Sequence, residues 1–250
     1  RDPSYVYAYF LMGQNALTLK DMNLAMASFT KVIELDNNNV SALVLRSSLF
    51  DSMNTSTPYS GTDMAPKDLE IEGKAINDIS TAIKVEESSS KYTFYAFSLP
   101  KLYVARAGYY FKAEQGLRSA KDYDKVITSV LVAQIPSMDI KTLRAIYPEF
   151  DSLTDEDLLE GLRQKYYPLH YQKKEFYDLV MNNIKDTRLA KNKDGTDDVL
   201  DKYSLSYYYY LRAESYYNSE DRYKAADDYR RVIRNYPEFP LDETRLVRMN

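Results

Sequence analysis

Two amphipathic segments near the N-terminus, residues 5–19 and 24–35, show the clearest pattern of apolar and polar positions in the chain. Apolar side chains recur in both at intervals of three and four residues, which is the spacing of one face of an α-helix. The polar run at residues 20–23 predicts a turn between them, and the run at 36–39 predicts the end of the second helix. The pattern therefore predicts an antiparallel helical hairpin.

The same spacing of small and large residues returns later in the chain. Ala75, Ile79 and Ala82 follow one another at the intervals that separate Ala25, Phe29 and Val32 at the start. Phe29 and Ile79 lie 50 residues apart, which fits a period of roughly 34 residues plus an insertion of about 16 residues. Residues 51–66 are rich in Ser, Thr, Asn, Asp and Gly, so we expect this insertion to be an exposed loop.

These positions resemble the tetratricopeptide repeat (TPR), a hairpin of two helices. The resemblance rests on an aromatic residue, a large–small pair, a second ring position, then Ala, a ring, a small or β-branched residue and a turn, which are here Tyr9, Met12, Gly13, Ala16, Ala25, Phe29, Val32 and Asn37. The first repeat departs from the family at Ala16, Val32 and Asn37. The resemblance implies an all-α fold, a right-handed superhelical stack of antiparallel helix pairs.

A third repeat carries Tyr103, Arg106-Ala107, Tyr110, Ser119, Tyr123 and Val126, and a final one carries Tyr209, Arg212-Ala213, Tyr216, Ala225, Tyr229, Val232 and Pro237. Between them the match weakens, and we expect an irregular helical hairpin in the same stack, with Tyr177 and Val180 at the ring and small positions. We therefore expect one domain, 1–250, with repeats at about 6–39, 40–88, 100–134 and 206–239, the hairpin at 140–190 and a partial cap at 240–250.

Composition excludes several kinds of partner. The net charge is −4, from 33 basic and 37 acidic residues, and no basic stripe predicts nucleic-acid binding. No apolar run approaches the roughly 20 residues that span a bilayer. Cysteine is absent, which excludes disulfides and thiolate zinc sites in this sequence. The 25 tyrosines, together with many Asn and Asp residues, favour an exported bacterial protein of the periplasm or cell surface.

Catalytic and cofactor motifs are not found in the sequence, so we expect a protein that is not an enzyme and binds no cofactor or metal. His170 is the single histidine and has no spaced partner for zinc. Residues 192–201 partly match a calcium loop, but its first ligand position is Ala190 and its last is Asp201, so an ordinary turn is expected. Acidic residues at 155–160 are explained by the dipole of a helix that Thr154 begins.

In the family, the first helix of each repeat lines a concave groove and contacts the ligand. Carrying these positions over gives Tyr7, Phe10, Leu11 and Gln14 in the first repeat, Val104, Gly108, Phe111 and Lys112 in the third, and Tyr207, Tyr210, Glu214, Tyr217 and Asn218 in the last. Some family members hold a terminal carboxylate with Lys and Asn here. Gln14, Gly108 and Glu214 occupy one key position, so we expect that carboxylate clamp to be absent.

Two classes of function remain. The first is a protein-interaction scaffold that binds a peptide or protein segment in an aromatic groove, because tyrosine gives large contact area at low entropic cost. The second is a carbohydrate or small-molecule binding protein of the cell envelope that stacks its ligand on tyrosine rings. Rings set flat and apart would favour a sugar, and a continuous ridged groove would favour a peptide. Packing against a neighbouring helix is the alternative for Tyr207, Tyr210 and Tyr217.

Overall fold

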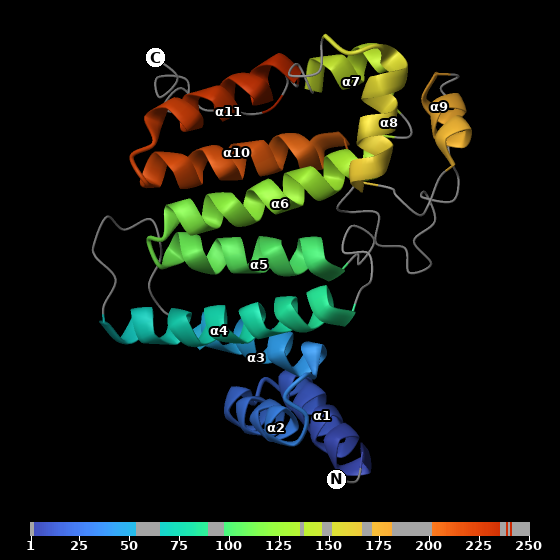
Figure 1. Cartoon of the computed structure of the whole chain (residues 1–250). Helices are drawn as coiled ribbons and strands as arrows, with labels where there is room; N and C mark the ends of the chain where they lie inside the picture. Colours follow the sequence, from blue (N-terminus) through green and yellow to red (C-terminus); the bar gives the residue numbers. More distant parts are fainter. Residues whose placement is uncertain are drawn as a thin grey trace. The chain divides into compact units, whose positions relative to one another are not determined.

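A computed structural model of the chain describes residues 3–53, 66–89, 98–135, 138–146, 152–166, 172–181 and 202–235, with Phe239 and Leu241. Throughout these ranges the regular structure is helical, as the sequence predicts. The elements are α1 (Pro3–Thr18), α2 (Met22–Leu35), α3 (Val40–Met53), α4 (Pro66–Ser89), α5 (Ser98–Lys112), α6 (Gly116–Gln134), α7 (Ile140–Ile146), α8 (Asp155–Tyr166), α9 (Lys173–Met181), α10 (Lys202–Asn218) and α11 (Arg222–Asn235) (Figure 1).

Several predictions fall outside the described residues. They concern His170, the stretch 192–201, Pro237, most of the inserted loop (54–65) and the cap beyond Leu241. At the edges of the loop, α3 runs to Met53 and α4 begins at Pro66, the residue expected in its first turn.

By the contacts between residues, the chain divides into two compact units, 1–126 with 206–250, and 127–205. The expected domain 1–250 stays a prediction. The expected irregular hairpin at 140–190 falls in the second unit, with α7, α8 and α9.

The first hairpin closes around Phe29, which is fully buried with Ala16, Ala25 and Val32. Asp21 begins α2 by accepting a hydrogen bond from the backbone N–H of Leu24 at 3.0 Å. A Cβ atom at Gly13 would lie 2.7 Å from the Phe29 ring. The ring of Phe29 therefore leaves room only for glycine at position 13. This explains the small residue in the large–small pair Met12-Gly13.

The later repeats bury the same positions. Ala75, Ile79 and Ala82 on α4 have no exposed surface, and neither do Ala225, Tyr229 and Val232 on α11. On α6, Ser119, Tyr123 and Val126 are buried as well, with exposed fractions of 0%, 5% and 0%. The predicted spacing thus locates the interface between the two helices of each repeat, which confirms the stack of helix pairs.

A repeated ion pair joins the two helices within three of the repeats, and the sequence did not predict it. In three repeats an arginine on the first helix donates through two nitrogens to an aspartate on the second helix. The pairs are Arg46 with Asp78 (2.7 and 2.8 Å), Arg106 with Asp122 (2.7 and 2.8 Å), and Arg212 with Asp228 (2.7 Å for both). These aspartates are 2–3% exposed. In the first repeat the two positions hold the uncharged Met12 and Ser28.

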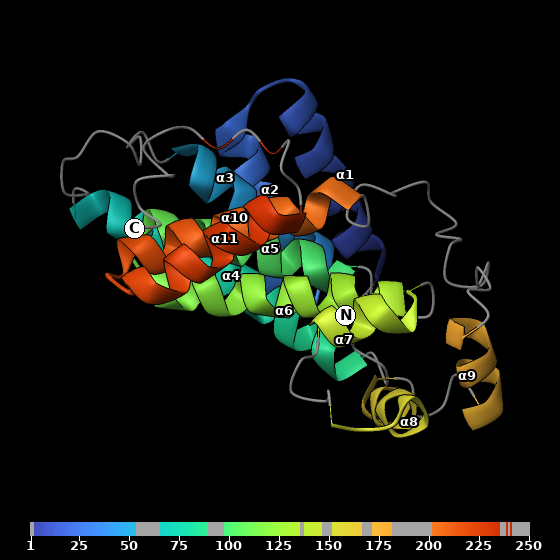
Figure 2. The same ribbon diagram turned by 90° about the horizontal axis from the view of Figure 1, so that it is seen from above.

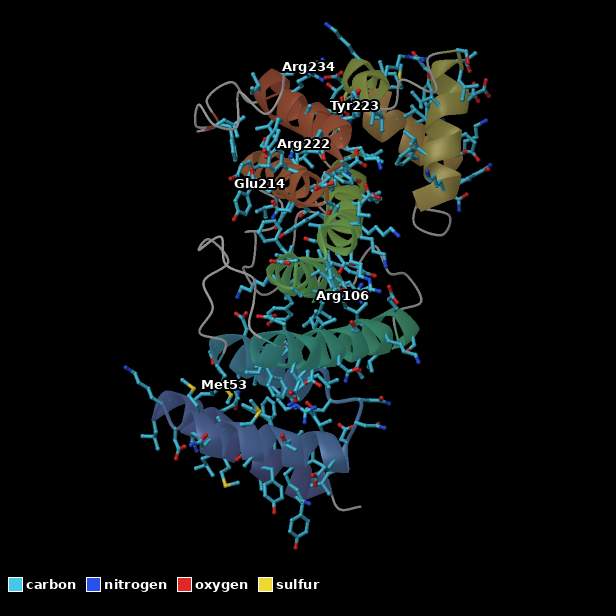
Figure 3. The ribbon with its side chains drawn as sticks, turned by 90° about the vertical axis from the view of Figure 1, so that its left-hand side faces the viewer. Met53, Arg106, Glu214, Arg222, Tyr223 and Arg234 are labelled. Atoms are coloured by element: carbon cyan, nitrogen blue, oxygen red, sulfur yellow. The ribbon has the colours of Figure 1, made fainter. Side chains whose placement is uncertain are left out.

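Each of these arginines also donates from its third nitrogen to the preceding repeat. The acceptors are Thr30 at 3.2 Å from Arg46, Ser80 at 3.2 Å from Arg106, and Asp124 at 2.5 Å from Arg212. Each acceptor stands two residues after the aspartate position of its own repeat. Figure 3 shows Arg106 on the side of α5 that faces α4. We call this series of contacts the arginine ladder.

The ladder shows that α10 packs directly on α6, although residues 135–201 separate them in the chain. Ser119 and Ser215 hydrogen-bond across this contact at 2.9 Å. A Cβ atom at Gly116 would lie 2.4 Å from the Ser215 carbonyl oxygen, so the backbones meet closely there. The last repeat therefore continues the third one, and residues 135–201 are inserted between them in the sequence only.

The second unit packs α8 against α9 (Figure 2). The buried apolar side chains of α7, α8 and α9 are Leu143, Leu158, Leu159, Leu162, Phe176 and Val180. Thr154 accepts a hydrogen bond from the backbone N–H of Asp157 at 3.2 Å, which confirms it as the residue that caps α8. Arg144 pairs with Asp155, and Lys173 pairs with Glu156 at 2.7 Å. Asp155 and Glu156, at the start of α8, are thus engaged in ion pairs.

Candidate partner-binding surface

The tyrosines of α10 provide the most aromatic part of the expected groove. Tyr207 is 49% exposed, and its ring stacks on that of Tyr210 with centroids 6.4 Å apart and an interplanar angle of 25°. Tyr210 also contacts Tyr229 at 6.3 Å and Phe239 at 5.7 Å. Tyr210 therefore supports the core on one side, whereas Tyr207 presents its ring at the surface.

Glu214 lies in the interior, although the sequence places it at a ligand position. Glu214 is 7% exposed, and its side chain accepts a hydrogen bond from the hydroxyl of Tyr229 on α11. A carboxylate that receives this hydrogen bond is satisfied inside the repeat. The surface of α10 therefore offers rings to a ligand at this level instead of a negative charge.

The C-terminal end of α10 adds two more candidates. The Tyr217 ring is half-buried, and the guanidinium of Arg222 lies 4.3 Å from its centroid. Asn218 is exposed. The C-terminal end of α10 therefore carries a ring, a guanidinium over that ring and an amide. These groups form a polar border of the aromatic surface.

On α5, Phe111 and Lys112 are half-buried, and Lys112 forms an ion pair with Asp51 of α3. A Cβ atom at Gly108 would contact nothing within 4 Å, so the space above this residue is open. Val104 is half-buried one turn earlier. The lysine expected to meet a ligand is thus already neutralised by the neighbouring repeat.

On α1, Tyr7 is 64% exposed and Gln14 is exposed. Leu11 is 40% exposed. Phe10 is half-buried because its ring packs edge-on against Phe29, with centroids 5.8 Å apart. Of the first-repeat candidates, Tyr7, Leu11 and Gln14 are accessible to a partner, and Phe10 belongs to the hairpin core.

Burial raises the pKa of two phenols on the covered side of α10, those of Tyr208 and Tyr209. Burial works against the charge of Arg212, but its hydrogen bonds to Asp228 raise the pKa of the guanidinium. Burial also raises the pKa of Asp228, an effect that the bonds from Arg212 oppose. The charges near the rings are therefore paired with each other.

The described ranges contain no group of three or more His, Cys, Asp or Glu side chains placed to hold a metal ion. Among the helices of these ranges, none combines the length and the apolar character that a membrane span requires.

Comparison with protein families finds two matches to the tetratricopeptide repeat, at residues 6–39 and 207–238. A search of curated proteins finds no match. Among solved structures, one entitled "Crystal structure of MamA protein" aligns over 96% of this chain and 100% of its own, with 13% identity and a TM-score of 0.40. The last value is too low to support an argument.

The two family matches coincide with the first and last repeats, which the sequence and the packing define independently. The buried ring and small positions recur in α4 and α6 between them. This chain is therefore a tetratricopeptide-repeat protein.

Proposed function

We propose that the protein is a non-catalytic scaffold that binds a peptide or protein segment on the first helices of its repeats, with the rings of α10 as the main contact. Tetratricopeptide repeats generally bind protein partners. The observation that supports this site is Tyr207, a ring that is 49% exposed and held in place by stacking on Tyr210. A fixed ring loses little conformational freedom on binding and offers a large contact area.

The ring arrangement favours a peptide over a carbohydrate. A sugar needs an open ring face, but Tyr207 and Tyr210 cover part of each other, and Tyr210 is also contacted by Tyr229 and Phe239. Charge recognition contributes little, because Lys112 is paired with Asp51 and Glu214 accepts the hydroxyl of Tyr229. We therefore expect a partner segment whose apolar or proline side chains contact the rings.

The test is site-specific photo-crosslinking with a photoreactive phenylalanine at position 207 or position 7, carried out in lysate of the native source. Tyr223 on α11 is the matched control, because it is an exposed tyrosine (92%) outside the proposed surface. We expect one protein to be crosslinked from positions 207 and 7 and not from 223. Tyr207→Ala should then weaken its binding about tenfold or more, the loss of a binding hot spot, and Tyr223→Ala should leave it unchanged.

Crosslinks that form equally from position 223, or a captured protein that binds the Tyr207→Ala variant with wild-type affinity, would move the site elsewhere. Circular dichroism of the variants checks that they fold, which we expect because Tyr207→Ala leaves the contact of Tyr210 with Tyr229 intact.

A further inference from the structure

The helix α1 carries a second surface, distinct from the proposed groove. Residues 3–19 contain no Asp, Glu, Lys or Arg, in a chain that is 28% charged. Thirteen large apolar side chains are exposed in the part of the chain that the structure describes, and three of them, Tyr5, Met12 and Leu19, lie here outside the groove candidates. Large exposed apolar patches in proteins commonly mark interaction sites.

Comparison with the other repeats identifies which face of α1 this is. In α3, α5 and α10, the residues four before and three after the ladder arginine are buried against the preceding repeat: Ala42 and Leu49, Leu102 and Tyr109, and Tyr208 and Ser215, all at most 8% exposed. Ala42 and Leu49 belong to the same apolar cluster as Phe29 of the first hairpin, and Ser215 bonds Ser119 of α6. These positions form the stacking face of each repeat.

In the first repeat the equivalent residues are Ala8 and Asn15, on either side of Met12, and all three are exposed. Met12 takes the place of the ladder arginine, and Ser28 takes the place of its aspartate. The residues of α1 at the stacking positions are therefore not covered by any described residue. This face carries Met12 at the position where the other repeats carry the charged ladder arginine.

The exposed residues on this face also have a regular spacing. Tyr5, Ala8, Met12, Asn15 and Leu19 follow at intervals of three, four, three and four residues, and all of them are exposed. This heptad spacing is that of a seam between two helices that pack at a small angle. Tyr5 and Leu19 each lie seven residues from Met12, and Ala8 and Asn15 lie four residues before it and three after it. An antiparallel copy would therefore oppose Met12 to Met12 and Tyr5 to Leu19, and would place Ala8 within one residue of the level of Asn15.

We propose that α1 pairs with α1 of a second copy of this chain through this face, which gives a symmetric dimer. No charged side chain occurs along the seam, so two copies meet without repulsion. A head-to-tail arrangement with α11 fits less well. In that arrangement α11 of one copy would meet α1 of the next. The residue of α11 at the acceptor position of the ladder, two residues after Asp228, is the exposed Arg230, and its charge would lie against the apolar Met12.

The dimer surface is separate from the proposed groove. The exposed groove candidates of α1 are Tyr7, Leu11 and Gln14, and none of them is a seam position. Loss of one activity therefore need not affect the other, and the two proposals can fail independently.

Sedimentation velocity of the 250-residue chain over a range of concentrations tests the dimer. We expect the mass to rise with concentration from that of one chain to that of two. Met12→Lys and Met12→Glu, at the centre of the seam, should each raise the dissociation constant about tenfold or more, because each places like charges opposite each other. Mixing the two variants should restore association, since Lys then meets Glu.

Tyr223→Lys is the matched control, an exposed ring changed to a charge on α11, and should dimerise like the wild type. A wild-type chain that stays monomeric at every concentration overturns the proposal. So does a dimer that the Met12 variants leave unchanged, or variants that fail to associate when mixed while each keeps its helical content by circular dichroism.

Discussion

The ladder predicts a large coupling between Arg106 and Asp122. Their side chains are 15% and 5% exposed, and two hydrogen bonds of 2.7 and 2.8 Å join them. Asp122→Ser would leave the guanidinium beside α6 with its counter-charge removed, and breaking a buried pair in this way typically costs about 3–5 kcal/mol. We expect Asp122→Ser to lower the free energy of unfolding by that amount.

The double variant Arg106→Met with Asp122→Ser should recover most of the loss. It copies the uncharged pair Met12 and Ser28 that the first repeat uses at the same positions. Replacing both members of a buried pair is often neutral, so we expect a free energy of unfolding within about 1 kcal/mol of wild type. Met can also keep contact with the rings of Tyr103 and Tyr110, over which the guanidinium now lies.

Urea denaturation followed by far-UV circular dichroism measures these differences for both single variants, the double variant and wild type. Asp227→Ser is the control, because Asp227 pairs with Arg231 at the surface (61% and 47% exposed), and should cost less than about 1 kcal/mol. The reasoning is refuted if Asp122→Ser costs no more than this control, or if the double variant is as unstable as Asp122→Ser.

Three further predictions concern packing and pH. Gly116→Ala should destabilise the protein by about 1–3 kcal/mol in thermal denaturation, because the added Cβ atom has no room. Gly108→Ala should stabilise it by about 0.5–1 kcal/mol, because this helical residue faces open space. Equal effects of the two substitutions would refute this prediction. Phe29→Ala should cost about 3–5 kcal/mol in urea denaturation, as its ring is fully buried, and a loss under 1 kcal/mol would show that the core collapses around it. The hydrogen bonds from Arg163 lower the pKa of Glu160 from 4.5 to about 2. The stability that this pair contributes is therefore complete above a pH of about 4.5 and is lost as the pH falls through about 2. Carbon-detected NMR should report this pKa, and Arg163→Ala should return it toward 4.5.

The sequence alone predicted the helical hairpins well, because the pattern that defines them is local. The positions of Ala25, Phe29 and Val32 recur as Ala225, Tyr229 and Val232, and all six are fully buried. The cap at Thr154 follows from two residues that are close in the chain. Helix periodicity and capping act over a few residues, so they can be recognised without knowledge of the tertiary structure.

The candidate surface was predicted less completely. Tyr7 and Tyr207 are exposed on the first and last repeats, as residues available to a partner must be. Glu214 occupies a family ligand position, yet it is buried because Tyr229 of the next helix donates a hydrogen bond to it. A tyrosine at the ring position has a hydroxyl that phenylalanine lacks, and this was the available sign that a polar partner would be found inside the repeat.

The sequence by itself determined the repeat and the two helices that form it, since apolar periodicity specifies which side of each helix must be covered. Only the tertiary structure decided which helix covers it. Asp78 lies 32 residues from Arg46, whereas 16 residues separate the other ladder pairs, and α10 packs on α6 across an inserted unit. Chain closure costs depend weakly on loop length, so long insertions are tolerated and the sequence distance says little about the spatial neighbour. The exposed stacking face of α1 was likewise recognised only in the tertiary structure, by comparison with the repeats in which that face is buried.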